Sequence, residues 1–170
     1  MMKLPRLLAP ALLLAALAGG GLVAYQSLSQ RELAPTVNYV LLNGAKVDSG
    51  QWAGKVMLVN FWATSCTTCV KEMPQIIATH EKFQARGFDT LAVAMSYDPP
   101  AFVANFAESR KLPFSVAIDN TGDIARQFGK IQLTPTTLLI NKRGEIVKRY
   151  VGEPDFTALH SLVEKLLAET

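Results

Sequence analysis

The sequence contains only two cysteines and two histidines among its 170 residues. A structural zinc site takes four cysteine or histidine ligands at recognisable spacings, and neither His80 nor His160 stands in such a spacing to the cysteines. The chain also lacks internal repeats and any basic run interleaved with aromatic residues. These absences argue against a zinc module and against a nucleic-acid-binding surface.

Most of the chain also carries no excess of positive or of negative charge. There are 17 Lys and Arg residues against 14 Asp and Glu, which gives a net charge of +3. Two of the basic residues, Lys3 and Arg6, precede the first apolar segment, so 15 basic residues face 14 acidic ones in the remainder. The remainder is therefore nearly neutral, and 49% hydrophobic residues suffice for the core of one domain.

The longest apolar run lies at residues 7–25, directly after Lys3 and Arg6, and no charge follows it until Arg31. Its length is close to the roughly 20 residues that a membrane-spanning helix needs. Cations before the run and few after it predict that the N-terminus stays inside and that the rest of the chain is exported. A cysteine near the run is absent, which excludes a lipid-modified N-terminus.

We therefore expect three parts: a signal-anchor at residues 1–26, a linker at 27–34 and a domain at 35–170. The expected location is the inner membrane, with the domain on the periplasmic side. The alternative is a signal peptide cut after Ala16-Leu17-Ala18, which would leave a soluble periplasmic protein. Apolar residues continue beyond that cut, and this favours the anchor.

From residue 35 onward, strand-like and helix-like patterns alternate. Residues 55–62 are an almost continuous apolar run, typical of a strand covered on both faces. Apolar residues at helical spacing follow from Cys66 to about Arg86. The other expected elements are strands at 36–42, 88–96 and 114–119, a β-hairpin within 134–152, and helices at 101–111, 121–129 and 156–166. This order predicts an α/β fold with a mixed β-sheet and helices on both of its faces.

Both cysteines, Cys66 and Cys69, lie in the segment NFWATSCTTCVKEMP, at the expected start of a helix. A structural disulfide at this spacing would close a loop of four residues, which constrains the unfolded chain very little. A redox pair has a clearer physical basis. The N–H groups and dipole of a helix N-terminus favour the thiolate of Cys66, and Cys69 is then placed to resolve a mixed disulfide.

These features resemble the thioredoxin superfamily, over roughly residues 35–168. Within it the chain is most similar to the membrane-anchored TlpA/ResA/CcmG-type disulfide reductases. The similarity is carried by VNFWATSCTTCVKEMP, by LTPTTLLINKRGEIV and by an additional strand–helix module at about residues 88–112. The resemblance implies a thioredoxin-like fold in which the Cys66–Cys69 disulfide is the redox group and no other cofactor is needed.

The resemblance also implies roles for five further residues. Pro135 matches the cis-proline opposite the cysteines, and Thr134 before it is expected to pair with the backbone of a substrate. Glu72 matches an acid expected to transfer protons for Cys69 or to raise the pKa values of the thiols; the alternative is a solvated helix carboxylate. Asn60 is expected to satisfy a local hydrogen bond, and Trp62 to pack under the active site or simply in the core.

The chain departs from the family pattern beside the first cysteine. Ser65 stands where family members often have tryptophan, and Thr67-Thr68 lacks the proline often found between the cysteines. The first change removes a large apolar contact surface for substrates. The second changes how the helix N-terminus stabilises the thiolate, so that the reduction potential cannot be carried over from a relative.

The function predicted from these observations is extracytoplasmic reduction of protein disulfides. Expected partners are disulfide-bonded exported proteins, among them apocytochrome c, and a membrane thiol-transfer protein that supplies electrons. Two alternatives remain open: a peroxiredoxin-like thiol peroxidase, and a non-catalytic module that delivers a metal or holds a client. The sequence does not contain the cysteine framed by proline and threonine that a peroxiredoxin usually needs. It also does not contain the distant histidine that copper carriers of this fold add.

Overall fold

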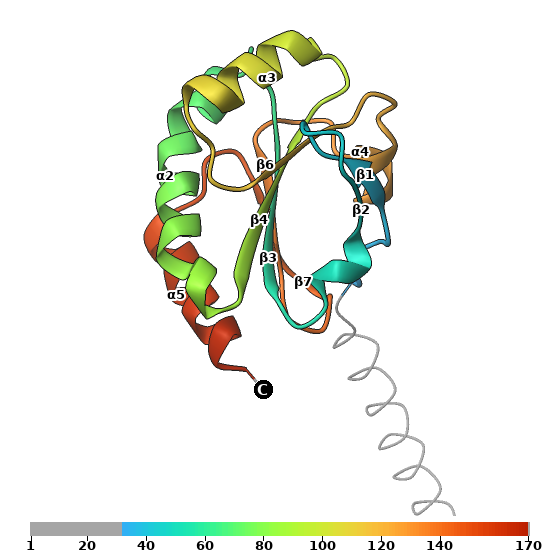
Figure 1. Cartoon of the computed structure of the whole chain (residues 1–170). Coiled ribbons are helices and arrows are strands. Elements are labelled where there is room, and N and C mark those ends of the chain that lie inside the picture. Colours follow the sequence, from blue (N-terminus) through green and yellow to red (C-terminus); the bar gives the residue numbers. More distant parts are fainter. Residues whose placement is uncertain (1–31, 170) are drawn as a thin grey trace, which may run out of the picture. The chain divides into compact units, whose positions relative to one another are not determined.

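The computed structural model describes residues 32–169 (Figure 1). The expected anchor and most of the expected linker lie outside these residues. No helix between residues 32 and 169 is long and apolar enough to cross a membrane. Glu32 to Ala34 do not form a free linker, because Ile146 donates a hydrogen bond to the Glu32 carbonyl and Ala34 donates one to Gly144. Contacts of the domain therefore extend to Glu32, which belongs to the same compact unit.

A five-stranded mixed sheet forms the centre of the domain, in the strand order β5-β4-β3-β6-β7. β3 is parallel to β4 and β4 is parallel to β5, whereas β6 is antiparallel to both β3 and β7. The strands are β3 Val56–Trp62, β4 Phe88–Ala94, β5 Ser115–Ile118, β6 Thr136–Ile140 and β7 Ile146–Val151. The mixed direction predicted from the sequence is confirmed.

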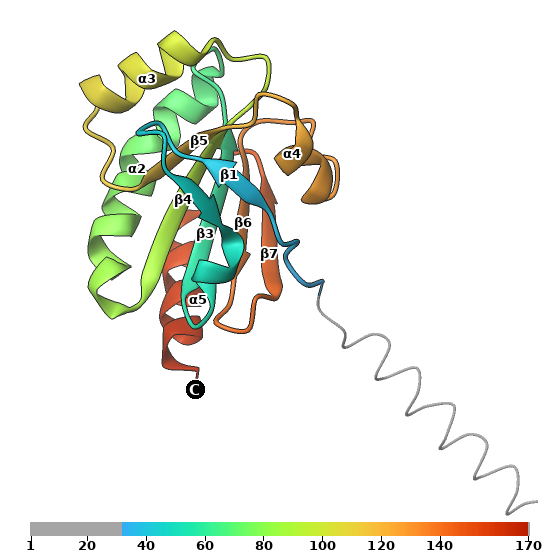
Figure 2. The same cartoon turned by 45° about the vertical axis from the view of Figure 1, so that its right-hand side comes forward.

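Helices cover one face of this sheet and a second, smaller sheet shares the other (Figures 1 and 2). The first face packs against α2 (Thr67–Phe83), α3 (Pro100–Ser109) and α5 (Phe156–Ala168). The opposite face packs against α4 (Asp123–Gln127) and the first strand of the small sheet. Every residue of β3 is buried, with alternate side chains in the two cores, which explains its continuous apolar sequence.

The small sheet differs from the expected strand at residues 36–42. Only Asn38–Val40 forms a strand, β1, and it pairs with β2, Lys46–Asp48, which we had not expected. The chain reverses between them at Gly44, whose φ of 83° suits glycine. β2 is only three residues long and none of them is fully buried, so its sequence carries little periodic signal.

The helix expected at residues 121–129 is shorter than predicted, and an acid that precedes it holds its start. The carboxylate of Asp119, buried at the end of β5, accepts hydrogen bonds from Ile124 N–H at 3.1 Å and Ala125 N–H at 2.8 Å. Asp119, directly after β5, thus accepts hydrogen bonds from N–H groups in the first turn of α4.

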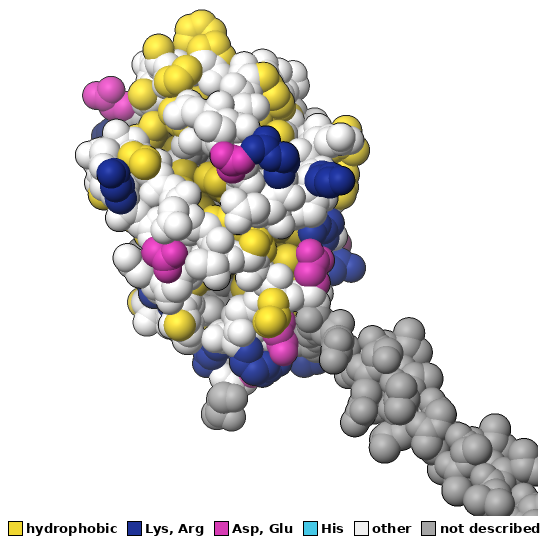
Figure 3. All heavy atoms as spheres, turned by 90° about the vertical axis from the view of Figure 1, so that its right-hand side faces the viewer, with side chains coloured by type: hydrophobic (Ala, Val, Ile, Leu, Met, Phe, Trp, Pro, Cys, Tyr) yellow, Lys and Arg dark blue, Asp and Glu magenta, His cyan; other side chains and the backbone are white. Residues whose placement is uncertain are grey.

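Charge is evenly distributed on the face that Figure 3 shows. Lys and Arg side chains alternate there with Asp and Glu, and neither sign gathers into a large area (Figure 3). Ion pairs on the surface of the described domain include Lys55 with Asp89 at 3.1 Å and Arg143 with Glu145 at 2.9 Å. This distribution agrees with the near-neutral composition of the domain.

Candidate active site

The two cysteines lie where the chain leaves β3 and enters α2. Cys66 N–H donates to the Ala63 carbonyl at 3.1 Å, which closes a turn directly after the strand. Cys66 is the N-cap of α2, and its Sγ accepts a hydrogen bond from Cys69 N–H at 3.2 Å. Cys66 and Cys69 form a disulfide. The sulfur of Cys66 therefore faces the unpaired N–H groups at the positive end of a 17-residue helix.

The two sulfur-bearing residues differ in accessibility. Cys66 is half-buried, whereas Cys69 is 0% exposed and belongs to the main hydrophobic core. Ser65, Thr67 and Thr68 around them are exposed. A macromolecular disulfide can therefore reach Cys66 but not Cys69, so that only Cys66 is placed for the first attack.

Beneath the cysteines, three elements bring together a buried polar cluster. Asn60 of β3 donates both of its amide hydrogens, one to Glu72 Oε1 at 3.0 Å and one to Thr137 Oγ1 at 2.9 Å. Asn60 and Thr137 are directly opposite each other in the β3–β6 register, and Glu72 reaches them from α2. The expected hydrogen bond of Asn60 is thus present, and Thr137 is a member that the sequence did not indicate.

Glu72 is 1% exposed, so the alternative of a solvated helix carboxylate is wrong. Burial raises the pKa of Glu72 to about 7, the hydrogen bond from Asn60 opposes this rise, and repulsion from Glu153 adds to it. Among the described residues, Glu72 Oε2 has no hydrogen-bond partner, which also favours the protonated form. Glu72 therefore exchanges a proton near neutral pH, one helical turn after Cys69.

Trp62 is the last residue of β3 and is fully buried. Its ring lies against Phe106 of α3, with the ring centroids 5.0 Å apart, and it shares the core cluster that contains Cys69. The side chain thus joins α3 to the layer under the disulfide, which combines the two expectations for this residue.

Pro135 and Thr134 precede β6, and the Thr134–Pro135 peptide bond is cis, as the resemblance implied. The β3–β6 register pairs Phe61 with Thr136, so Pro135 comes level with the end of β3, from which the cysteine turn departs. Pro135 is buried and Thr134 is partly exposed, with its Oγ1 3.2 Å from the hydroxyl of Tyr97.

Asp98 is a further residue at this end of the sheet that the sequence did not indicate. It is 2% exposed, and its carboxylate accepts hydrogen bonds from the N–H and the hydroxyl of Thr64, two residues before Cys66. The contact joins segments 34 residues apart, which local sequence patterns do not reveal.

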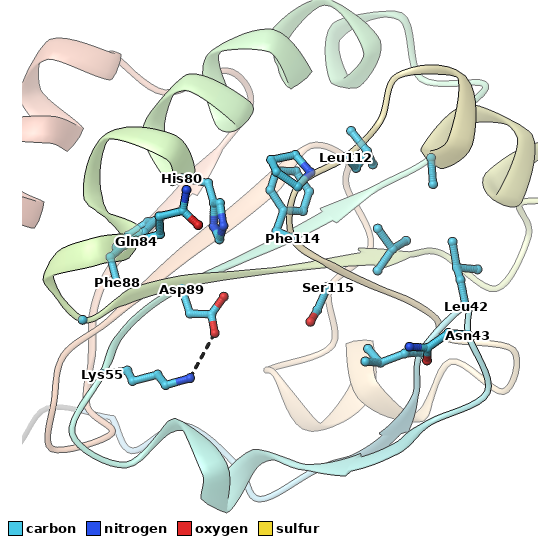
Figure 4. Close-up of a pocket in the computed structure, with 15 residues that line it drawn as sticks. Leu42, Asn43, Lys55, His80, Gln84, Phe88, Asp89, Leu112, Phe114 and Ser115 are labelled. Atoms are coloured by element: carbon cyan, nitrogen blue, oxygen red, sulfur yellow. Dashed lines mark hydrogen bonds and ion pairs between the residues drawn. The ribbon is translucent and has the colours of Figure 1, made fainter.

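A pocket of about 570 Å³ lies at the other end of α2 and contains none of the expected site residues (Figure 4). His80 on its wall is buried, 14 residues along the helix from Cys66, which corresponds to roughly 20 Å. Its Nδ1 lies 3.2 Å from Thr90 Oγ1, its ring packs edge-on against Phe114, and burial lowers its pKa. His80 is thus a packing residue.

The fold and the site together define a class of protein. A mixed sheet whose central strand leads into a helix, a Cys66–Cys69 disulfide at the start of that helix and a cis-proline at the neighbouring strand are the parts of a thioredoxin-fold active site. The half-buried first cysteine and the buried second one are the chemical groups of thiol–disulfide exchange. The domain is a thiol-disulfide oxidoreductase.

Comparison with known proteins identifies the family. The Redoxin family matches residues 29–166, and the thiol-disulfide oxidoreductase ResA of Bacillus cereus is 33% identical over 97% of this chain and 99% of its own. ResA of Bacillus subtilis is 32% identical over 79% of this chain and 74% of its own. The chain therefore belongs to the Redoxin family and, within it, to the ResA-type thiol-disulfide oxidoreductases.

Solved structures agree with this assignment. A solution structure from Neisseria meningitidis superimposes with a TM-score of 0.76 at 39% identity, over 83% of this chain and 93% of the other. A thiol:disulfide interchange protein from Chlorobium tepidum superimposes with a TM-score of 0.75 at 25% identity, over 82% and 99%. Both likenesses extend over nearly all of the described domain.

Proposed function

We propose that this protein reduces disulfides in exported proteins, with Cys66 as the attacking thiol and Cys69 as the resolving thiol. The observation that carries the proposal is the contrast between the half-buried Cys66 at the helix start and the fully buried Cys69 behind it. The contrast suits two thiols that act in sequence, because the second attack is intramolecular and needs no exposed thiol.

The reaction begins with the reduced dithiol. The Cys66 thiolate attacks one sulfur of the client disulfide, and the other client sulfur leaves as a thiolate and takes up a proton. The Cys69 thiol then loses its proton and attacks Cys66 Sγ, which releases the second client sulfur as a thiolate. The client disulfide has gained two electrons, and the Cys66–Cys69 dithiol has become the disulfide seen in the structure.

Glu72 is proposed as the group that accepts the Cys69 proton. A buried thiol is a poor acid because its thiolate is desolvated, so resolution needs a base nearby. A carboxyl group whose pKa is raised to about 7 is suited to this exchange at neutral pH. Asn60 holds one Glu72 oxygen in place, and the other oxygen has no protein partner among the described residues.

Client binding is proposed to rest on the Thr134 backbone rather than on a large side chain beside Cys66. Ser65, Thr67 and Thr68 present a small polar surface around the nucleophile. Thr134 is partly exposed ahead of β6 and can pair with an extended client segment as an additional strand. Recognition of this kind reads the client backbone and depends little on the client sequence.

The proposed location is the inner membrane, with the domain on the periplasmic side and the anchor in residues 1–26. The apolar run behind Lys3 and Arg6 supports this location. The similarity to ResA-type oxidoreductases supports a role in exchange with other exported proteins. Apocytochrome c is the proposed client, because its haem-binding cysteines must be reduced, and a membrane thiol-transfer protein is the proposed electron donor.

The test is a single-turnover reaction of the reduced full-length protein with a peptide that holds an oxidised Cys-x-x-Cys-His loop. We expect stoichiometric reduction of the peptide together with oxidation of Cys66 and Cys69, read by mass spectrometry after alkylation. The Cys66→Ser/Cys69→Ser variant is the control and should reduce none. Rapid oxidation by hydrogen peroxide without reduction of the peptide would contradict the proposal and favour the peroxidase alternative.

A further inference from the structure

The neighbouring parallel strands β3 and β4 are each followed by a turn, and the two turns lie side by side. The β3 turn is closed by the hydrogen bond from Cys66 N–H to Ala63, and the β4 turn by one from Asp98 N–H to the Met95 carbonyl at 2.9 Å. Met95 N–H also donates to the Trp62 carbonyl at 3.0 Å, which extends the pairing of the two strands. The turn that carries Asp98 is thus fixed beside the turn that leads to Cys66.

Asp98 joins the two turns through both of its oxygens. Oδ2 accepts from Thr64 N–H at 2.6 Å and Oδ1 accepts from Thr64 Oγ1 at 2.5 Å. Asp98 thus holds both the backbone and the side chain of Thr64 through charge-assisted hydrogen bonds. Because Asp98 is 2% exposed, its negative charge is little screened by water. Thr64 is the second residue of the turn that ends at Cys66, so the charge lies close to the nucleophile.

We infer that Asp98 is a positioning residue that clamps the turn before Cys66 and, through its buried charge, disfavours the Cys66 thiolate. A thiolate is the form in which the reduced protein gains stability from the helix N-terminus, and a nearby negative charge offsets that gain. Destabilising the reduced form makes the couple a stronger reductant. The consequence for reduction rests on the proposed function, whereas the effect on Cys66 itself does not.

Other charged groups near Cys66 and Cys69 do not have the effect proposed for Asp98. On α2, Lys71 is exposed and pairs with Glu153, which follows β7, at 3.0 Å, so that their charges compensate each other. Glu72 on the same helix has its pKa raised to about 7 and is only partly ionised at neutral pH. Asp98 is the acid among these that contacts the turn carrying Cys66.

The experiment compares Asp98→Asn with the parent in the full-length reduced protein. Asparagine has the same shape but carries no charge, and it can keep both contacts: its oxygen can accept from Thr64 N–H and its NH2 group can donate to Thr64 Oγ1. We expect the midpoint of Cys66 alkylation against pH to move to lower pH, by roughly three- to tenfold in proton concentration. The equilibrium with glutathione should move toward the dithiol, where a tenfold change corresponds to about 30 mV.

Asp119→Asn is the matched control. Asp119 is also 2% exposed, also follows a strand of the sheet and also accepts two hydrogen bonds, but it serves α4 on the opposite face. It should leave the alkylation midpoint within about twofold of the parent, whatever it does to stability. An Asp98→Asn midpoint that stays within the same range, or that moves to higher pH, would overturn the inference.

Thr64→Val provides a second test that does not need Asp98→Asn to fold. It keeps the charge of Asp98 but removes the hydroxyl that partly neutralises it, so the midpoint should move to higher pH, opposite to Asp98→Asn. A role in positioning alone would leave the Asp98→Asn midpoint near that of the parent, because asparagine keeps both contacts to Thr64. If only Thr64→Val folds, an unchanged or lower midpoint overturns the inference. Because alkylation requires no client, this test stands whether or not the protein proves to be a reductase.

Discussion

Cys69→Ser is expected to accumulate a covalent mixed disulfide with a client, at least roughly tenfold more than Cys66→Ser, because only a resolving thiol can release the first adduct. In the structure Cys66 is half-buried and accepts a hydrogen bond from Cys69 N–H, whereas the Cys69 side chain is fully buried. An external disulfide therefore meets Cys66 first. Non-reducing electrophoresis of each variant, followed by mass spectrometry of the adduct, measures the difference.

Alkylation of the reduced parent at mildly acidic pH should show the same order, with Cys66 modified well before Cys69. The variant that lacks both cysteines controls for adducts at other positions, of which there should be none, since the chain has no third cysteine. Trapping by Cys66→Ser alone would reverse the order of attack and make Cys69 the nucleophile. Equal trapping by the two single variants would contradict any division of roles between the cysteines.

Glu72→Gln should make the oxidised protein more stable than the parent at pH 8 and leave it similar at pH 5. The pKa of Glu72 is raised from 4.5 to about 7 in the folded protein, so the folded state binds more protons than the unfolded state between these values. The stabilisation that protonated Glu72 gives the folded parent is present at low pH and is lost as the pH rises through about 7. The difference between the two proteins should grow by about 2–3 kcal/mol from pH 5 to pH 8.

Denaturant unfolding at a series of pH values measures this difference. The contributions of His80 and His160 are common to both proteins and cancel. Glu164→Gln is a suitable control, because Glu164 is an exposed helix residue paired with Lys82 at 3.5 Å, and its effect should stay within about 1 kcal/mol. A difference between Glu72→Gln and the parent that does not change with pH would contradict a buried, protonated Glu72.

The same variant should slow resolution of the mixed disulfide. Without a carboxylate to accept the Cys69 proton, the step is expected to slow by roughly 10²- to 10⁴-fold, the usual range for general acid–base catalysis. Attack by Cys66 should be nearly unaffected. Rapid-quench analysis of a single turnover separates the two steps, and an unchanged resolution rate would remove Glu72 from the mechanism.

Much of this site could be predicted because its signals are local in the sequence. The buried strand before Cys66, the helix that starts there and the hairpin after Pro135 each follow from patterns within about 20 residues. The resemblance placed Pro135 and Glu72 near the cysteines. The environment of Glu72 was not predicted, because it depends on how α2 packs over β3 and β6, where Asn60 and Thr137 meet it.

The contact of Asp98 with Thr64 escaped prediction for a related reason. It depends on the parallel register of β3 and β4, which places the two strand ends side by side although the residues are far apart in the chain. The short strand β2 was missed because three residues carry no measurable period. Local patterns thus fix the elements, whereas tertiary packing decides which polar side chains surround the disulfide.

The most direct test of the account is the reduction potential of the Cys66–Cys69 couple, measured at pH 7 by equilibrating the full-length protein with glutathione buffers. A protein that reduces client disulfides should have a potential close to that of thioredoxin, between about −220 and −280 mV. A potential near the roughly −120 mV of a strong periplasmic oxidant would contradict the account, because the protein would then take electrons from its clients instead of donating them.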